Sequence, residues 1–134
     1  MAPMRWRVAV LAGALALPLA ACAAPRAPQP QAAATPPAAL VGQWNGSWDA
    51  TFPTTLVVEQ VRPGQAQVIY EWGVAPAWNI DIPGQERSIA HYDGRRLVVL
   101  LANGAVASYV AQPDGTLRGT YRFGSRIAYA TLRQ

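Results

Sequence analysis

The sequence predicts an all-β protein, a small antiparallel up-and-down β-barrel of about eight strands in residues 41–134. Apolar and polar residues alternate in short runs, which is the two-residue period of a strand. Turn pairs such as Asp93-Gly94 and Asn103-Gly104 separate these runs and fit tight hairpins between neighbouring antiparallel strands. No stretch keeps the spacing of an amphipathic helix, and a flattened β-sandwich is the main alternative.

Residues 1–21 precede this fold and have the pattern of an export signal. Arg5 and Arg7 are followed by fourteen uncharged, mainly apolar residues at 8–21. At about 1.5 Å per residue, this run is too short to span a hydrocarbon core of about 30 Å. We therefore expect a signal peptide rather than a transmembrane helix.

A lipid anchor is predicted at Cys22, the only cysteine of the chain. The residues Leu19-Ala20-Ala21-Cys22 resemble the lipobox of bacterial lipoproteins, in which the cysteine is acylated and the leader is cut just before it. The alternative is an ordinary leader in which Cys22 is a small apolar residue. Ala23 stands where an aspartate would resemble an inner-membrane retention signal. The resemblance therefore implies the periplasmic face of the outer membrane.

The lipidated cysteine and a tether occupy residues 22–40 of the predicted organisation. Residues 23–40 contain eight alanines and five prolines and show no apolar periodicity. Such chains are extended, at about 3.1 Å per residue, and behave as semi-rigid spacers. We expect a disordered Ala/Pro linker here, with the barrel domain beginning at Val41.

Eight strands are expected in the domain, and a long irregular stretch at residues 73–86 separates the third from the fourth. Residues 97–101 are all apolar, so this strand is either covered on both faces or exposes an apolar stripe. The expected strands are 42–50, 54–61, 66–72, 87–92, 95–101, 105–112, 116–123 and 126–133.

The alternation also predicts which side chains fill the interior. In the third and seventh strands, apolar residues or glycine alternate with polar residues that include two arginines. Arginine side chains are costly to bury without partners, so the apolar set faces inward. The expected inward residues are Val68, Tyr70, Trp72, Leu117, Gly119, Tyr121 and Phe123.

The first expected strand carries Gly42-Gln43-Trp44-Asn45-Gly46-Ser47-Trp48. Trp44 and Trp48 share one face but lie about 13 Å apart along a strand, so they are expected in two different layers. Gly42 and Trp44 resemble the Gly-x-Trp motif in the first strand of the calycins, the lipocalin and avidin group. That resemblance implies a calycin-like barrel with an interior that is either filled or holds one small ligand.

Composition excludes several classes of function. All eleven basic residues are arginines, and only eight of them follow residue 40, against seven acidic residues. The domain therefore carries a net charge of about +1, and we expect no nucleic-acid partner. Only one histidine, His91, is present and lysine is absent, so we expect no metal site and no Schiff-base chemistry. Asp93 shares the face of His91 and could orient its ring.

Other catalytic patterns are missing from the sequence as well. The serines of the domain stand outside a nucleophile elbow, and no spacing brings two carboxylates together. The chain also has no glycine-rich phosphate loop. We therefore expect no catalytic residues, no cofactor and no enzyme activity.

The candidate ligand site lies at a barrel mouth formed by the irregular stretch and the ends of the aromatic strands. Long loops on a rigid barrel often carry function, and an aromatic beside polar groups can hold a small ligand. The alternative is that Trp78 only plugs the mouth. The expected ligand-binding residues are Trp48, Tyr70, Trp72, Trp78, Asn79 and Asp81.

These features together predict a non-catalytic, membrane-anchored envelope lipoprotein whose barrel binds a small apolar or aromatic ligand. The first alternative is an envelope protein that docks on another protein or on cell-wall polymer through residues 97–101. Arg118, Arg122 and Arg126 would add a basic stripe to that surface. A hydrolase or inhibitor-type module is the second alternative.

Overall fold

The computed structural model describes residues 37–134, and these form one short α-helix, one 3₁₀ turn and eight strands. The predicted signal peptide, Cys22 and most of the predicted tether lie outside the described residues. Among the residues that are described, no helix is long and apolar enough to cross a bilayer. The strands are β1 (Gly42–Trp48), β2 (Phe52–Arg62), β3 (Gly64–Trp72), β4 (Gly84–Tyr92), β5 (Arg96–Leu100), β6 (Val106–Ala111), β7 (Leu117–Phe123) and β8 (Arg126–Leu132).

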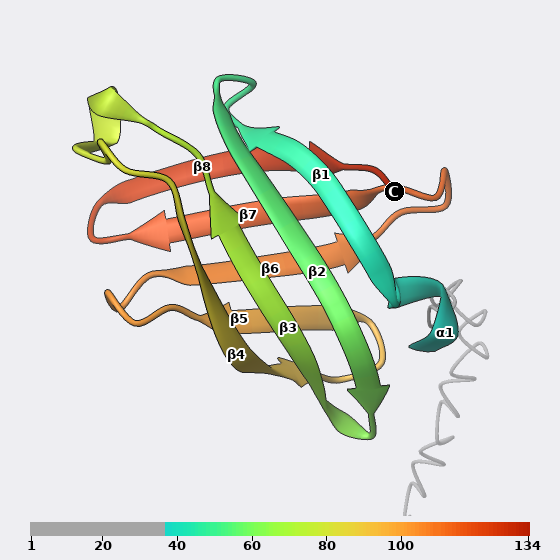
Figure 1. Ribbon diagram of the computed structural model, residues 1–134. Coiled ribbons are helices and arrows are strands. Elements are labelled where there is room, and N and C mark those ends of the chain that lie inside the picture. Colours follow the sequence, from blue (N-terminus) through green and yellow to red (C-terminus); the bar gives the residue numbers. More distant parts are fainter. Residues whose placement is uncertain (1–36) are drawn as a thin grey trace, which may run out of the picture. The chain divides into compact units, whose positions relative to one another are not determined.

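Each strand pairs antiparallel with the next along the chain, in the order β1 to β8. In Figure 1, β1–β4 cross in front of β5–β8, and the sheet curls until its two edge strands meet. The predicted antiparallel up-and-down barrel of eight strands is therefore confirmed, with a nearly closed wall.

The barrel closes between β1 and β8. Asn45 and Arg133 exchange backbone hydrogen bonds, with N···O distances of 2.7 and 2.9 Å. The N–H of Asp49 donates to the Tyr129 carbonyl at 2.8 Å, and the Tyr129 N–H donates to Asp49 Oδ1 at 3.0 Å. Closure removes most of the free edge that would otherwise invite aggregation.

The pairing between β4 and β5 is short, and it is limited to His91 with Val98 and Tyr92 with Leu97. Beyond these pairs the two strands separate, and side chains of β4 bridge to the β5 chain. Ser88 Oγ donates to the Leu100 carbonyl at 3.4 Å. The barrel is consequently wider at the end where β4 begins.

The two tryptophans of β1 lie in different layers of the core, as predicted. Trp44 and Trp48 are 4% and 1% exposed. Trp44 donates its indole N–H to the Leu40 carbonyl at 2.9 Å, whereas Trp48 donates to Tyr70 Oη at 3.0 Å. Buried indoles need such partners because an unpaired N–H in an apolar interior is costly.

A short helix, α1 (Pro37–Leu40), precedes β1. Leu40 is buried in the core cluster beside Trp44, whose indole N–H donates to the Leu40 carbonyl. The folded part therefore begins four residues before Val41, inside the segment that the sequence assigns to the tether. The reason is local, because a leucine after an Ala/Pro run adds apolar surface that the barrel end can cover.

The predicted inward faces of β3 and β7 are confirmed except at one end. Val68, Tyr70, Leu117 and Tyr121 are buried, and Trp72 is partly buried against the core. Phe123 is 43% exposed, so its predicted inward position is wrong. It has the parity of the buried residues of β7, but it is the last residue of the strand and is not buried with them.

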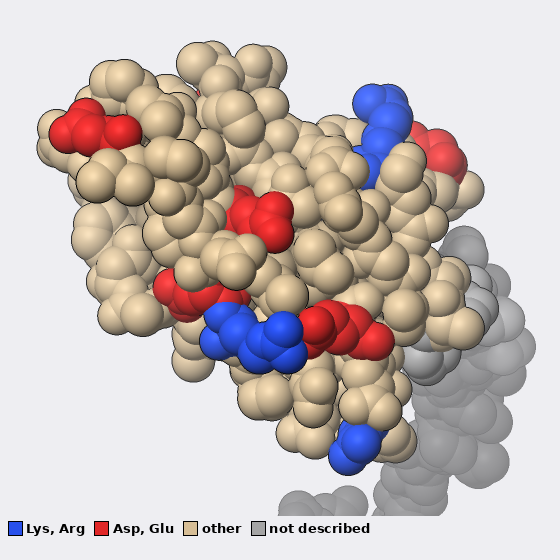
Figure 2. Space-filling model, in the orientation of Figure 1, with Lys and Arg blue, Asp and Glu red and all other residues tan. Residues whose placement is uncertain are grey.

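The apolar strand at 97–101 exposes a stripe rather than being covered on both faces. Leu97, Val99 and Leu101 are buried, whereas Leu100 is 67% exposed. The outer surface over β1–β4 is mostly uncharged, and Figure 2 shows a basic side chain there between acidic ones. Arg87 and Glu59 form an ion pair on the outer surface, at 3.0 Å.

Candidate functional site

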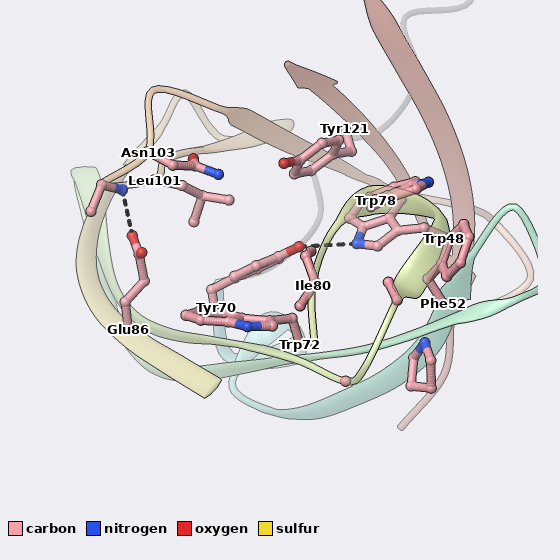
Figure 3. Close-up of a pocket in the computed structure, with 14 residues that line it drawn as sticks. Trp48, Phe52, Tyr70, Trp72, Trp78, Ile80, Glu86, Leu101, Asn103 and Tyr121 are labelled. Carbon is pink, nitrogen blue, oxygen red and sulfur yellow. Dashed lines mark hydrogen bonds between the residues drawn. The ribbon is translucent and has the colours of Figure 1, made fainter. Parts of the chain in front are cut away.

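A cavity of about 290 Å³ opens at the end of the barrel where β1, β3 and β7 finish and β2 and β4 begin. Its wall is mainly apolar and includes six aromatic residues, whose rings Figure 3 shows arranged around the open space. The lining residues are Trp48, Phe52, Pro53, Tyr70, Trp72, Gly73, Ala75, Trp78, Ile80, Glu86, Leu101, Ala102, Asn103 and Tyr121.

Trp48 forms the inner end of the cavity. Its ring packs against Tyr109 and Tyr121, with centroid distances of 6.1 and 5.6 Å. Gly119 on β7 makes room for it, because a Cβ there would lie 3.0 Å from the Trp48 ring and 3.2 Å from the Tyr109 ring. The hydrogen bond to Tyr70 then fixes the orientation of the indole.

Tyr70 and Trp72 form one side wall, since alternate residues of β3 point to the same face. Their ring centroids are 6.0 Å apart. Gly84 lies opposite Trp72 in the β3–β4 register, and a Cβ there would come within 2.5 Å of the Trp72 ring. Trp72 also donates to the Ile82 carbonyl at 3.3 Å, which ties the β3–β4 loop to the wall.

The β3–β4 loop supplies Trp78, which closes part of the mouth and lines the cavity at once. It lies at the end of a single 3₁₀ turn, η1 (Pro76–Trp78). Its ring lies 4.7 Å from that of Phe52 and stacks on Tyr121 at 5.1 Å. The guanidinium carbon of Arg126 lies 4.8 Å from the ring centroid, a cation–π contact. These contacts hold the loop tryptophan in one place.

Two polar side chains, Glu86 and Asn103, complete the lining. Glu86 Oε1 accepts the backbone N–H of Ala102 at 3.0 Å, across the gap between β4 and β5. Asn103 Oδ1 accepts the N–H of Ala105 at 2.9 Å. The carboxylate and amide are thus set by backbone hydrogen bonds rather than left free to rotate.

Burial determines the chemistry of the tyrosines next to the cavity. Desolvation raises the pKa of Tyr70, although the hydrogen bond from Trp48 opposes the shift. Burial raises the pKa of Tyr109 well above the ordinary value, and the nearby Tyr70 hydroxyl adds to it. Both phenols are therefore neutral near pH 7, and the Tyr70 hydroxyl serves as a hydrogen-bond acceptor for Trp48 rather than as a base.

Four of the six predicted ligand-binding residues come together here, namely Trp48, Tyr70, Trp72 and Trp78. Asn79 and Asp81 lie outside the lining. Asn79 caps η1 with a left-handed backbone (φ 58°), and its N–H donates to the Pro76 carbonyl. Asp81 is exposed on the loop. Nearness to Trp78 in the sequence does not place them in the cavity wall, because it is Ile80, the residue between them, that lines the cavity.

Several lining residues were not predicted. Tyr121 has interior parity in an expected strand and could have been included on that ground. Glu86 lies in the stretch expected to be irregular, yet it continues the inward series of Ser88, Ala90 and Tyr92 in β4. Phe52 begins β2 and Leu101 directly follows β5, and alternation alone does not predict which end of the barrel such terminal residues face.

The remaining predicted features do not converge on a second site. His91 is exposed, and Asp93 Oδ1 accepts the backbone N–H groups of Arg95 and Arg96 at 2.9 and 2.7 Å. These bonds lower the pKa of the Asp93 carboxyl. Within residues 37–134, no three His, Cys, Asp or Glu side chains gather as metal ligands would.

Arg126 does not lie on the predicted basic stripe with Arg118 and Arg122. Arg118 and Arg122 are exposed on β7, whereas Arg126 is partly buried over Trp78 at the mouth. Arg126 has the inward parity of β8, like Ala128 and Ala130. It lies at the strand start and so stacks on the loop tryptophan instead of joining the outer face.

Comparison of the chain with protein-family descriptions, with curated protein sequences and with solved structures finds no match in any of the three.

Proposed function

We propose that this protein is a lipid-anchored envelope protein whose barrel binds one small apolar or aromatic molecule in the mouth cavity, without catalysis. The observation that carries the proposal is the cavity itself, about 290 Å³ in volume and walled by Trp48, Phe52, Tyr70, Trp72, Trp78 and Tyr121. Ligand sites in proteins are concave and mostly apolar, with a few placed polar groups. This cavity has that composition.

Its size limits the ligand. A cavity of about 150 Å³ lined by apolar side chains holds benzene, and drug-sized ligands occupy about 300 Å³ or more. The volume of about 290 Å³ therefore suits a molecule of one or two rings. Aromatic walls favour such a ligand because rings stack on and pack edge-to-face against one another.

Binding of benzyl alcohol, followed by tryptophan fluorescence and by calorimetry, tests this proposal. Ala102 is exposed at the rim and lines the cavity, so Ala102→Phe should obstruct it and weaken binding roughly tenfold or more. Ala77→Phe is the matched control, because Ala77 is an exposed residue of η1 outside the lining. Equal affinity in both variants, or no binding to the unaltered protein, would contradict the proposal.

The lipid anchor is a separate part of the proposal and rests on the lipobox resemblance at Cys22. Several acyl chains, at about 0.8 kcal/mol per buried methylene, hold a protein firmly on a membrane. In a bacterial host, Cys22→Ala should abolish incorporation of labelled fatty acid and release the protein from the outer-membrane fraction. Retention of label by the variant would rule out acylation at this cysteine.

A docking surface is the second candidate function, favoured by exposed apolar residues of β4 and β5. Ile89 is 59% exposed, and Leu100 lies on the outer face of the neighbouring strand. Grouped apolar side chains on an outer surface are a feature of interaction sites. Leu100→Glu should then lose an envelope partner that Arg118→Glu keeps, in a pull-down from detergent-solubilised membranes.

A further inference from the structure

We propose that the small, largely apolar ligand of the mouth cavity carries one positive charge, as an organic ammonium whose apolar groups pack between the aromatic rings and whose charge lies near the Glu86 carboxylate. This inference rests on the proposed ligand-binding function and names the chemical class of the ligand. It follows from the combination of a ring-lined cavity with one carboxylate in its wall.

The charge of Glu86 is not balanced by a neighbouring cation. The only ion pair within residues 37–134 joins Arg87 to Glu59, on the outside of the barrel. Glu86 Oε1 accepts a hydrogen bond from Ala102, and no donor among these residues reaches the second oxygen. The side chain is only partly exposed, so its charge is also partly removed from water. A cationic ligand would supply the counter-charge that this carboxylate lacks within the described residues.

The aromatic walls are suited to the same kind of ligand. The faces of indole and phenol rings carry negative electrostatic potential and attract organic ammonium groups, as in aromatic cages. Figure 3 shows Tyr70 and Trp72 beside the open space, with Glu86 on one side of it and Trp78 on the other. A cation between the rings would therefore contact π faces and lie near the carboxylate.

The position of Arg126 agrees with this arrangement. Its guanidinium already occupies one face of Trp78, at 4.8 Å from the ring centroid, so a second cation at that place would be repelled. Arg126 is not part of the cavity lining. The favourable place for the ligand's charge is thus the Glu86 side, against Tyr70 and Trp72.

The hydrogen bond to Ala102 does not by itself explain a carboxylate at position 86. The amide oxygen of a glutamine would accept the same N–H and would close the gap between β4 and β5 without a charge. What the glutamate adds is the negative charge. Glu86→Gln therefore separates the charge from the structural bond.

The test compares choline with 3,3-dimethylbutan-1-ol, which has the same shape but a carbon in place of the charged nitrogen. Calorimetric titration should show choline binding at least about tenfold more tightly to the unaltered protein. Glu86→Gln should lower the choline affinity about tenfold and leave the affinity for the alcohol within twofold. Glu71→Gln is the matched control, because Glu71 lies in β3 on the opposite face, outside the lining.

The outcomes distinguish this inference from the function on which it rests. If the alcohol binds as well as choline, or if Glu86→Gln leaves choline binding unchanged, the ligand is not a cation, but the cavity remains a binding site. If choline, the alcohol and benzyl alcohol all fail to bind, both proposals are wrong. Should Glu86→Gln not fold, the salt dependence in the unaltered protein decides, since only choline binding should weaken as ionic strength rises.

Discussion

Gly119 determines how deeply Trp48 can enter the barrel. Gly119 is buried in β7, and its missing side chain leaves the space that the indole and the Tyr109 ring occupy. Protein interiors are close-packed, so even one added methyl group has to displace a neighbour. Trp48 cannot yield easily, because it is fully buried and hydrogen-bonded to Tyr70.

Gly119→Ala should therefore lower the free energy of unfolding by about 1–3 kcal/mol through overpacking. Urea denaturation followed by circular dichroism measures this change. Thr120→Ala, on the outer face of the same strand, is the control and should change stability by less than about 0.5 kcal/mol. A Gly119→Ala protein as stable as the control would show that Trp48 is not held against β7.

The buried tyrosines predict how stability depends on alkaline pH. Burial raises the pKa of Tyr70 and Tyr109 in the folded state above the ordinary value of 10.0. On raising the pH, the unfolded chain therefore loses these protons first. The free energy of unfolding should be unaffected below about pH 9 and should fall above pH 10, by at most about 1.4 kcal/mol per pH unit for each tyrosine.

Urea denaturation at about pH 9 and about pH 11 checks this dependence, and Tyr109→Phe should make it smaller. The chain has no lysine, so lysine side chains do not add to the titration in this range. Tyr109 Oη has no hydrogen-bond partner among the described protein atoms, so its removal should cost little at neutral pH. An unchanged pH dependence in Tyr109→Phe would show that this phenol titrates normally in the folded protein.

At the scale of strands and turns, closure of the barrel depends on the turn after β1. Asp49 and Ala50 both have positive φ values, 48° and 57°, and Thr51 N–H donates back to the Trp48 carbonyl at 3.0 Å. This conformation directs both the N–H and the carboxylate of Asp49 toward Tyr129 of β8. The turn therefore joins β1 to β2 and also to β8.

Asp49→Ala should destabilise the protein by about 1–2 kcal/mol, because it removes one hydrogen bond of the closure and places alanine in a left-handed conformation. Hydrogen exchange should become faster at the Tyr129 amide. Asp49→Asn keeps an acceptor and tolerates positive φ, so it should behave like the unaltered protein. If Asp49→Ala exchanges no faster at Tyr129, the side-chain bond does not contribute to closure.

The same turn shows what the sequence could and could not predict about the fold. The strand count, the order of hairpins and most inward residues followed from alternation and from Asp-Gly and Asn-Gly pairs. The first strand was expected to continue to residue 50, because Asp49-Ala50 contains no glycine to indicate positive φ. Its conformation is set by bonds to β8, which is eighty residues away in the chain.

The candidate site was predictable only where it depends on strand parity. Trp48, Tyr70 and Trp72 face the cavity because alternate residues of a strand share a face. This alternation can be predicted from the sequence. The prediction for Asn79 and Asp81 rests only on their nearness to Trp78 in the sequence, which does not indicate where side chains point after a 3₁₀ turn. Glu86 was missed because β4 begins at Gly84, three residues before the expected strand.

At the scale of the whole domain, the barrel has one packed part and one hollow part. Around Trp44 the interior is filled and joined to α1, whereas the part beyond Trp48 holds the cavity. Separating β4 from β5 widens the mouth at the hollow end, and the loop with Trp78 covers part of it. The packed layer around Trp44 and the layer that holds the candidate binding site are thus different parts of one small barrel.

The indole N–H signals of the ¹⁵N-labelled protein test this division most directly. On titration with benzyl alcohol, the signals of Trp48, Trp72 and Trp78 should shift together and saturably, because these rings line the cavity. The signal of Trp44, whose N–H bonds to Leu40 in the packed layer, should stay in place. Equal shifts at all four indoles of residues 37–134, or a shift at Trp44 alone, would contradict the assignment of the ligand to the mouth of the barrel.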